Sequence, residues 1–158
     1  MSEESLLLKE IQQRRPFASR QQEAFLNLLR TAAVLGAAMD RWFKELGLTR
    51  TQYNALRILR GAHPGALACS EVGERMVTPV PDVTRLLDRL EAVGLVTRCR
   101  DSHDRRVVNV AISDRGLARL AELDEPLEEK LRELLAPLGD ADLATLVGLL
   151  ERARDGKA

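Results

Sequence analysis

The sequence is poor in aromatic residues and has no long apolar segment. Aromatic side chains make up 3% of its 158 residues, so neither an aromatic cage nor a base-stacking platform is expected. No apolar run approaches the roughly 18 residues that indicate a membrane-spanning helix. Residues 1–4 (MSEE) lack the basic and apolar stretches of a signal peptide. These absences predict a cytoplasmic protein whose core consists mostly of Leu, Ala and Val.

Cysteine and histidine, the residues most used in metal sites and in catalysis, are also rare. The chain has two of each. Cys69 and Cys99 are too far apart in sequence to indicate a disulfide or metal framework, and His63 and His103 fall in predicted loops. The sequence contains no nucleophile–base–acid set, phosphate loop or metal-ligand spacing. It therefore predicts a protein that is not an enzyme and that uses neither a cofactor nor a metal.

The two thiols leave one question open. They can be small, partly buried side chains, or one of them can be a redox sensor, which requires an exposed thiolate near positive charge. Cys99 lies between Arg98 and Arg100. Strand alternation, however, directs the Cys99 side chain to the face opposite both arginines.

The formal net charge of zero is by itself no sign of a nucleic-acid partner. The charges are nevertheless unevenly distributed. Residues 1–119 carry a basic excess of five, and residues 120–158 carry an acidic excess of five. A basic body with an acidic C-terminal part is compatible with a phosphate-binding face.

Apolar residues recur at intervals of three and four along most of the chain, which predicts amphipathic helices. The clearest covers residues 20–46, and Gly47 ends it. Residues 6–13 form a shorter helix or belong to an extended arm. Thr49 is a suitable N-cap for the next helix, which leads to a loop at residues 61–65.

Two helices joined by a tight turn follow that loop. Ser70 caps the first, over residues 71–76. Thr78 is the predicted N-cap of the second, over residues 79–93, which places the two prolines of the sequence PVP at its first and third positions. Proline costs little there because those backbone N–H groups have no partner within the helix.

A β-hairpin comes next. Two strand-like segments, residues 95–100 and 107–112, flank a charged turn at residues 101–106. Two helices joined by a tight turn and followed by a hairpin make a winged helix-turn-helix. Such a motif can place its second helix in the major groove of DNA and its hairpin tip in an adjacent minor groove.

Two leucine-rich helices complete the chain. Ser113 caps the first, which has a possible kink near Pro126 and ends at Pro137, and Asp140 caps the second. The helix over residues 20–46 and these C-terminal helices carry more Leu and Ala than a small winged module can cover. They are therefore expected to need a partner surface; the alternative is that they fold back on their own domain.

In these features the sequence resembles the MarR family of bacterial transcription regulators, over residues 20–150. The helix run together with the Asp-Arg-Arg wing is far more specific than a helix-turn-helix pattern alone. The residues that carry the resemblance are 48–53 (LTRTQY), Leu56, 83–91 (VTRLLDRLE), 94–96 (GLV), Arg98, 104–106 (DRR) and 113–116 (SDRG).

The resemblance implies a mainly α fold with a small β-hairpin wing, in a single MarR-like domain over residues 1–158. Residues 48–113 then form the winged helix-turn-helix, and residues 20–47 and 114–154 form dimerisation helices. It also implies a homodimeric repressor. Two-fold symmetry leads us to expect a pseudo-palindromic operator in double-stranded DNA.

The predicted DNA contacts come from both the helix-turn-helix and the wing. The resemblance implies that a wing arginine enters the minor groove, and we assign this role to Arg106, with Asp104 fixing its guanidinium group. Arg85 is the best candidate for a base or phosphate contact, whereas Arg89 and Asp88 can instead form intramolecular pairs. The PVP sequence can touch thymine methyl groups but cannot donate hydrogen bonds to bases, so groove shape is expected to supply more of the specificity. The full predicted set is Ser70, Thr78, Pro79, Pro81, Asp82, Thr84, Arg85, Arg89, Arg98, Asp104, Arg105 and Arg106.

The resemblance further implies a small aromatic or phenolic effector, bound between the dimer helices and the winged module, that weakens DNA binding. Met39, Trp42, Phe43 and Met76 are the candidate lining residues, with simple core packing as the alternative. Two other functions stay open at this stage. One is a winged-helix protein-interaction module without DNA binding, and the other is a thiol-based redox-responsive regulator.

Overall fold

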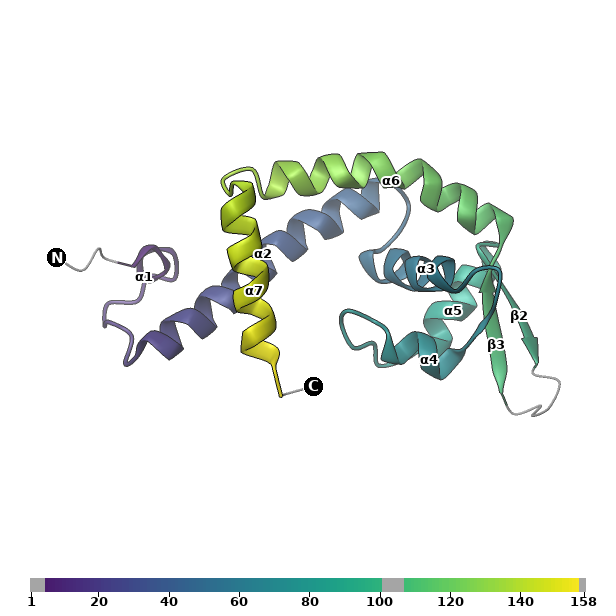
Figure 1. The fold of residues 1–158 in the computed structure, drawn as a ribbon, viewed down its shortest axis with the longest axis horizontal. Helices are drawn as coiled ribbons and strands as arrows, with labels where there is room; N and C mark the ends of the chain where they lie inside the picture. Colours follow the sequence, from purple (N-terminus) through teal and green to yellow (C-terminus); the bar gives the residue numbers. More distant parts are fainter. Residues whose placement is uncertain (1–4, 101–106, 157–158) are drawn as a thin grey trace. The chain divides into compact units, whose positions relative to one another are not determined.

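The computed structural model describes residues 5–100 and 107–156, which divide into two units (Figure 1). The first unit, Met1–Arg50, contains α1 (Leu6–Glu10) and α2 (Arg20–Glu45). The second unit, Thr51–Ala158, contains nearly all of α3 and every later element. Those elements are α3 (Arg50–Ala62), β1 (Leu67–Ala68), α4 (Cys69–Glu74), α5 (Val83–Ala92), β2 (Val96–Arg100), β3 (Val108–Ile112), α6 (Asp114–Leu134) and α7 (Asp140–Arg154).

The ends of α2 follow from local signals in the sequence. Ser19 Oγ accepts a hydrogen bond from a backbone N–H of the first turn at 3.1 Å. Gly47, with φ of +70°, follows the last turn in a conformation that glycine adopts without strain. The predicted helix over residues 20–46 is therefore confirmed to within one residue. Of the two alternatives left open for residues 6–13, the helix forms, as the shorter α1 (Leu6–Glu10), and an ion pair of 3.1 Å between Glu10 and Arg30 ties it to α2.

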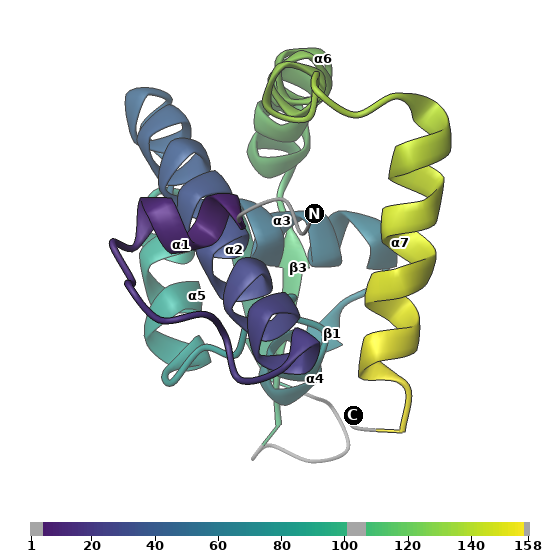
Figure 2. The ribbon, with the colours of Figure 1, turned by 90° about the vertical axis from the view of Figure 1, so that its left-hand side faces the viewer.

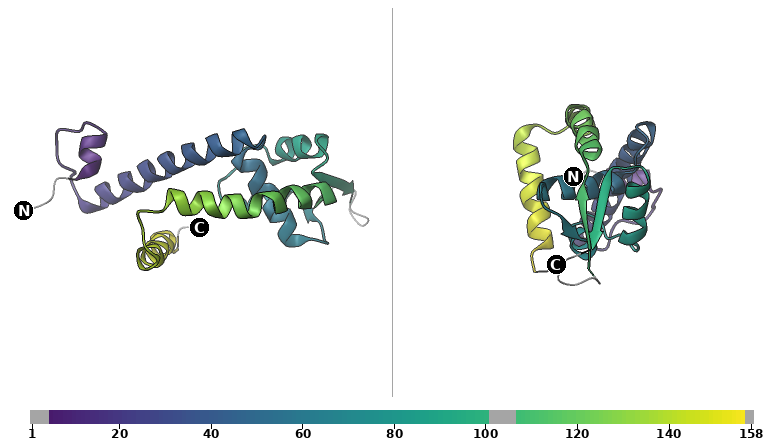
Figure 3. Two further views of the ribbon diagram at one scale, coloured as in Figure 1. Left: turned by 90° about the horizontal axis from the view of Figure 1, so that it is seen from above. Right: turned by 90° about the vertical axis from the view of Figure 1, so that its right-hand side faces the viewer.

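A three-stranded antiparallel sheet organises the second unit, with β3 at its centre in the order β1-β3-β2. The predicted hairpin is confirmed as β2 and β3, paired from Val96 opposite Ile112 to Arg100 opposite Val108. The sequence prediction missed β1, whose two residues are too few to show the alternation of a strand. In the views of Figures 1 and 3, α6 leads away from this sheet and carries α7 at its far end.

The core of the second unit is aliphatic, as the composition predicts. Its fully buried side chains come from each helix between α3 and α6 and from both strands of the hairpin; Figure 2 shows β3 lengthwise among these helices. They are Leu56, Leu59, Val72, Leu87, Leu90, Val96, Val110, Leu120 and Leu123.

The wing is joined tightly to the start of α6. Ser113 caps this helix as predicted, because its Oγ accepts from the Gly116 backbone N–H at 3.0 Å. The same hydroxyl donates to the Gly94 carbonyl oxygen at 2.7 Å. A Cβ at Gly116 would lie 2.3 Å from the Leu95 carbonyl oxygen, so only glycine permits this approach. Further along, α6 continues past Pro126 as one helix.

Two predicted helix caps are wrong by one or two residues. The N-cap of α4 is Ala68 and not Ser70, and Glu71 accepts a hydrogen bond from the Ala68 backbone N–H at 2.9 Å. The N-cap of α7 is Gly139, so Asp140 is the first helical residue, where its carboxylate faces the positive end of the helix dipole. The loop predicted at residues 61–65 begins two residues later, because α3 continues through Ala62.

The predicted start of α5 is wrong by four residues. Thr78 is not its N-cap, and both prolines of the PVP sequence lie in the connection before the helix. A residue that precedes proline is disfavoured in helical conformation, so Val80 does not fit in the first turn of a helix that starts at Pro79. Asp82 caps the helix instead, with Oδ1 accepting from the Arg85 backbone N–H at 2.8 Å.

Candidate nucleic-acid interface

The first turns of α5 present a polar, exposed surface. Thr84, Arg85 and Arg89 are exposed, while Leu86, Leu87 and Leu90 of the same helix are buried. The helix thus divides into an inner apolar face and an outer face that is free to approach a ligand. Four further predicted contact residues, Ser70, Thr78, Pro79 and Pro81, are also exposed, on α4 and on the connection to α5.

A buried side chain that the sequence prediction missed holds this connection in place. Asn54 on α3 is only 9% exposed, and its Oδ1 accepts a hydrogen bond from the Val77 backbone N–H at 2.9 Å. A buried amide without such a partner would be costly, so the bond ties the connection to the core at Val77. A polar residue among the apolar positions of α3 was the signal in the sequence.

The wing strands reach as far as Arg100 and Val108 in the described part of the chain. Asp104, Arg105 and Arg106, which carry the predicted minor-groove contact, lie outside the described residues, as does His103. The inward face of β2 holds Val96 and Arg98, and the opposite face holds Thr97 and Cys99, both exposed. The predicted alternation around Cys99 agrees with this pattern.

Arg98, predicted to bind phosphate, has its guanidinium group engaged within the protein. Nη1 donates to the Asp88 carboxylate and lies 3.7 Å from the Glu91 carboxylate, and Nη2 donates to the Thr84 carbonyl oxygen at 3.0 Å. The Arg98 side chain is 17% exposed. Asp88 therefore takes the intramolecular alternative that the sequence left open for it. The donors of the Arg98 guanidinium group are thus directed at α5.

An open groove of about 360 Å³ lies where the start of α4, the first turn of α5 and the wing strands meet. Three of the predicted contact residues, Ser70, Thr84 and Arg98, line it together with the half-buried thiol of Cys69. The remaining lining residues are Ala68, Val107 and Val108.

Comparison with known proteins agrees with this architecture. A family model described as the MarR family matches residues 46–107. The transcriptional regulator PecS of Dickeya dadantii is 31% identical over 127 residues, which make up 79% of this chain and 76% of PecS. The chain belongs to the MarR family. Members of the MarR family are transcription regulators and not enzymes.

Solved MarR structures show the same fold. A MarR transcription factor from Planctomyces limnophilus is 40% identical, with a TM-score of 0.68 over 86% of this chain and 98% of that one. BpsR of Bordetella bronchiseptica is 25% identical, with a TM-score of 0.77 over 90% of this chain and all of the other, 100%. These similarities confirm the predicted fold class, a mainly α protein with a winged helix-turn-helix.

The four residues predicted to line an effector pocket are divided between the two units. In α2, Met39 and Phe43 are buried and Trp42 is half-buried, with the Trp42 and Phe43 rings edge to face at 4.9 Å. Met76 belongs to the second unit. The burial of the first three is what the core-packing alternative expects, and their role in effector binding stays a prediction.

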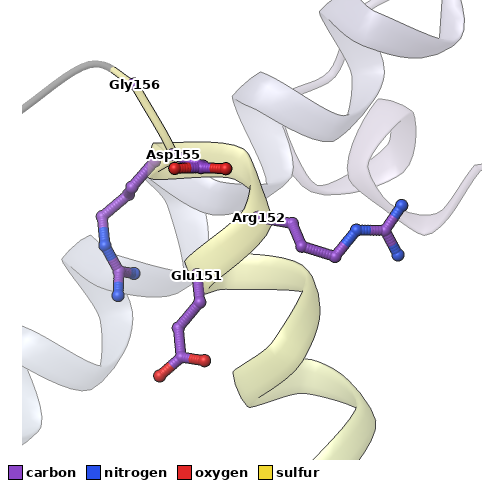
Figure 4. Close-up of a pocket in the computed structure, with 5 residues that line it drawn as sticks. Glu151, Arg152, Asp155 and Gly156 are labelled. Carbon is purple, nitrogen blue, oxygen red and sulfur yellow. The ribbon is translucent and has the colours of Figure 1, made fainter.

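A second pocket, of about 390 Å³, lies at the C-terminal end of α7 (Figure 4). Its lining residues all belong to one short stretch, and the side chains of Glu151 and Arg152 point away from each other. A surface formed by a single helix end with diverging charges cannot enclose a ligand, so we assign it no function.

The described part of the chain contains neither a disulfide nor a cluster of metal-ligand side chains. Cys69 and Cys99 are both free thiols. Within residues 5–100 and 107–156, no group of three or more His, Cys, Asp or Glu side chains could hold a metal ion. In the same ranges, no helix combines the length and the apolar character needed to cross a bilayer.

Proposed function

We propose that this MarR-family protein is a homodimeric repressor that binds a pseudo-palindromic operator and is released from it by a small aromatic ligand. The observation that carries the proposal is the pairing of an exposed polar face on α5 with large uncovered apolar surfaces on the terminal helices. The first supplies a DNA-contacting element, and the second supplies a reason for two copies to associate.

The uncovered apolar surface is extensive on two helices. Of the 26 residues of α2, only Gly36, Met39 and Phe43 are buried, and α7 buries none of its residues. A soluble monomer rarely leaves a large apolar helix face in water. A second copy of the chain is the occupant that accounts for it, because a two-fold axis would cover the same faces on both chains. The exposed large apolar residues are Phe25, Leu28, Leu29 and Val34 on α2, and Val147 and Leu149 on α7.

The proposed DNA contacts place α5 in the major groove, with Thr84 and Arg85 nearest the bases. Arg106 is proposed for the minor groove, with Asp104 orienting it and Arg105 near the backbone. Ser70, Thr78 and Arg89 are proposed phosphate contacts, and Pro79 and Pro81 meet thymine methyl groups. Asp82 acts through its cap, since its carboxylate is used to start α5.

The proposed ligand response draws on BpsR, whose structure concerns regulation of its DNA binding by 6-hydroxynicotinic acid. That compound is a small aromatic acid, the chemical class expected for this chain. A ligand that binds one arrangement of the dimer better than the DNA-bound one lowers operator affinity by its differential affinity.

The experiment that tests the function is selection of bound duplexes from a random-sequence DNA library, combined with analytical ultracentrifugation. The proposal expects a dimer and an enriched sequence with two related half-sites about ten base pairs, or a multiple, apart. It also expects affinity that falls steeply with salt. Enrichment of no sequence, or of a single unpaired site bound by a monomer, would contradict it.

A further inference from the structure

We propose that Arg98 is a positioning residue for DNA recognition: its guanidinium group fixes the recognition helix α5 against the wing and makes no phosphate contact itself. The inference rests on the proposed DNA-binding function and concerns how the two DNA-reaching elements are kept in register.

The geometry of the contact is the first argument. Arg98 lies on β2, one strand of the wing, and its three partners all lie on α5. Thr84, Asp88 and Glu91 are spaced by four and three residues, so they share one face of the helix across two turns. A single planar group therefore contacts two turns of the recognition helix at once. A guanidinium group is suited to this role because its donors form a rigid fork.

Burial is the second argument. The Arg98 side chain is 17% exposed, and its Nε is buried without a hydrogen-bond partner among the described residues. An arginine reaching for phosphate needs its donors at the surface. Here Nη1 and Nη2 bond to α5 while Nε is left without a partner in the described part of the chain. A buried donor without a partner lowers the stability of the fold. Such a costly arrangement is consistent with a gain in structural specificity.

Charge is the third argument. Asp88 and Glu91 put two carboxylates on a helix that is proposed to approach a polyanion. Arg98 pairs with both, at Nη1, and so offsets their repulsion of DNA phosphates. The positive charge of Arg98 is thereby used inside the winged module.

The direction in which Asp88→Asn changes DNA affinity distinguishes a positioning role of Arg98 from phosphate binding by Arg98. Asp88→Asn removes a negative charge near the DNA and releases the Arg98 guanidinium group. If Arg98 binds phosphate, this variant should bind DNA more tightly than the wild type. If Arg98 positions α5, the variant should bind its selected duplex several-fold more weakly, because α5 loses a charge-assisted hydrogen bond to the wing.

The second variant, Arg98→Lys, keeps the positive charge and removes the planar guanidinium group that bonds to several partners at once. We expect it to bind the selected duplex about tenfold more weakly, with a change of less than about twofold on a shuffled duplex of the same composition. The slope of log affinity against log salt should stay within about half a unit of the wild type, whereas loss of a phosphate contact lowers it by about one unit.

The matched control is Glu122→Gln, which removes the carboxylate of an exposed ion pair with Arg119 on α6. It should leave both affinities unchanged. Thermal unfolding of each variant checks that it is folded at the assay temperature. Tighter binding by Asp88→Asn, or a slope lowered by one unit in Arg98→Lys, would overturn the inference and leave the proposed function intact. A wild-type protein that enriches no sequence would overturn the proposed function itself.

Discussion

The winged module, predicted at residues 48–113, and the terminal helix α7 both carry leucines at helical spacing, yet they bury them very differently. In the winged module, Leu56, Leu59, Leu87 and Leu90 are fully enclosed. In α7, no residue is buried, and Leu149 is 53% exposed. The winged module completes its core within one chain, whereas α7 has an apolar face that one chain does not cover. A leucine stripe therefore predicts a helix, but it does not predict which molecule will cover it.

The largest effect that tests this difference is expected from truncating a core leucine. Leu87→Ala should lower the free energy of unfolding by about 2–5 kcal/mol at every protein concentration, because it leaves a cavity in an enclosed site. Leu149→Ala should cost about 1 kcal/mol or less, and its effect should grow smaller as the dimer is diluted. Chemical denaturation at two protein concentrations measures both. If both variants lost the same free energy of unfolding at every protein concentration, the winged module and α7 would not differ in how their leucines are covered.

A charge on the uncovered face of α2 should separate the two copies. Phe25 is 60% exposed in the single chain, so Phe25→Glu should leave the fold intact. We expect it to weaken dimerisation by about 2 kcal/mol or more, as burying a charge at an apolar interface does. Sedimentation velocity reports the dimer fraction. Val93→Glu, on an exposed apolar residue of the winged module, is the control and should remain dimeric; loss of the dimer in that variant instead would place the interface elsewhere.

Removing the Arg106 side chain at the wing should weaken DNA binding without changing the stability of the core or of the dimer. Arg106→Ala is expected to weaken binding to the selected duplex by about 1–3 kcal/mol and to lower the salt slope by about one unit. Arg132→Ala, which removes an exposed positive charge from α6, is the control. Fluorescence anisotropy at several salt concentrations gives both quantities. Unchanged affinity in Arg106→Ala would refute the minor-groove assignment.

The smallest expected effect is an alkaline loss of stability in the winged module. Burial raises the pKa of the Tyr53 hydroxyl above its ordinary value of 10.0, with Arg60 opposing the shift and Asp124 adding to it. The unfolded chain therefore loses this proton at a lower pH than the folded one. Stability from this group is complete below about pH 10 and is lost as the pH rises through the folded pKa. Unfolding measured across this range should show a shallower decline in Tyr53→Phe; an identical decline would refute the assignment.

The elements that the sequence predicted well depend on neighbours a few residues away. The first long helix, the two hairpin strands and the Ser113 cap were placed to within about one residue, because hydrophobic period, strand alternation and capping are local effects. The start of α5 was missed although its signals were also local. The two prolines exclude the residues before them from a helix, and Asp82 is a strong N-cap immediately afterwards.

The candidate site was predicted only in part, for a reason that concerns distance along the chain. The exposed residues of α5 follow from the amphipathic pattern of one helix. The role of Asn54 depends on a bond to Val77, 23 residues away, and that of Arg98 on three residues of another element. From sequence alone, Arg98 is an arginine on a strand of the wing, and a phosphate contact is the natural expectation for it.

By itself, the sequence determined the order of the helices and of the two hairpin strands, the aliphatic core and the family, since period, composition and motif spacing are properties of the chain. Only the tertiary structure decided that β1 completes the sheet, that a buried amide holds the connection before α5, and that one arginine of the wing faces inward. These are contacts between segments far apart in sequence. Their free energy depends on burial and on hydrogen-bond partners that no local pattern contains.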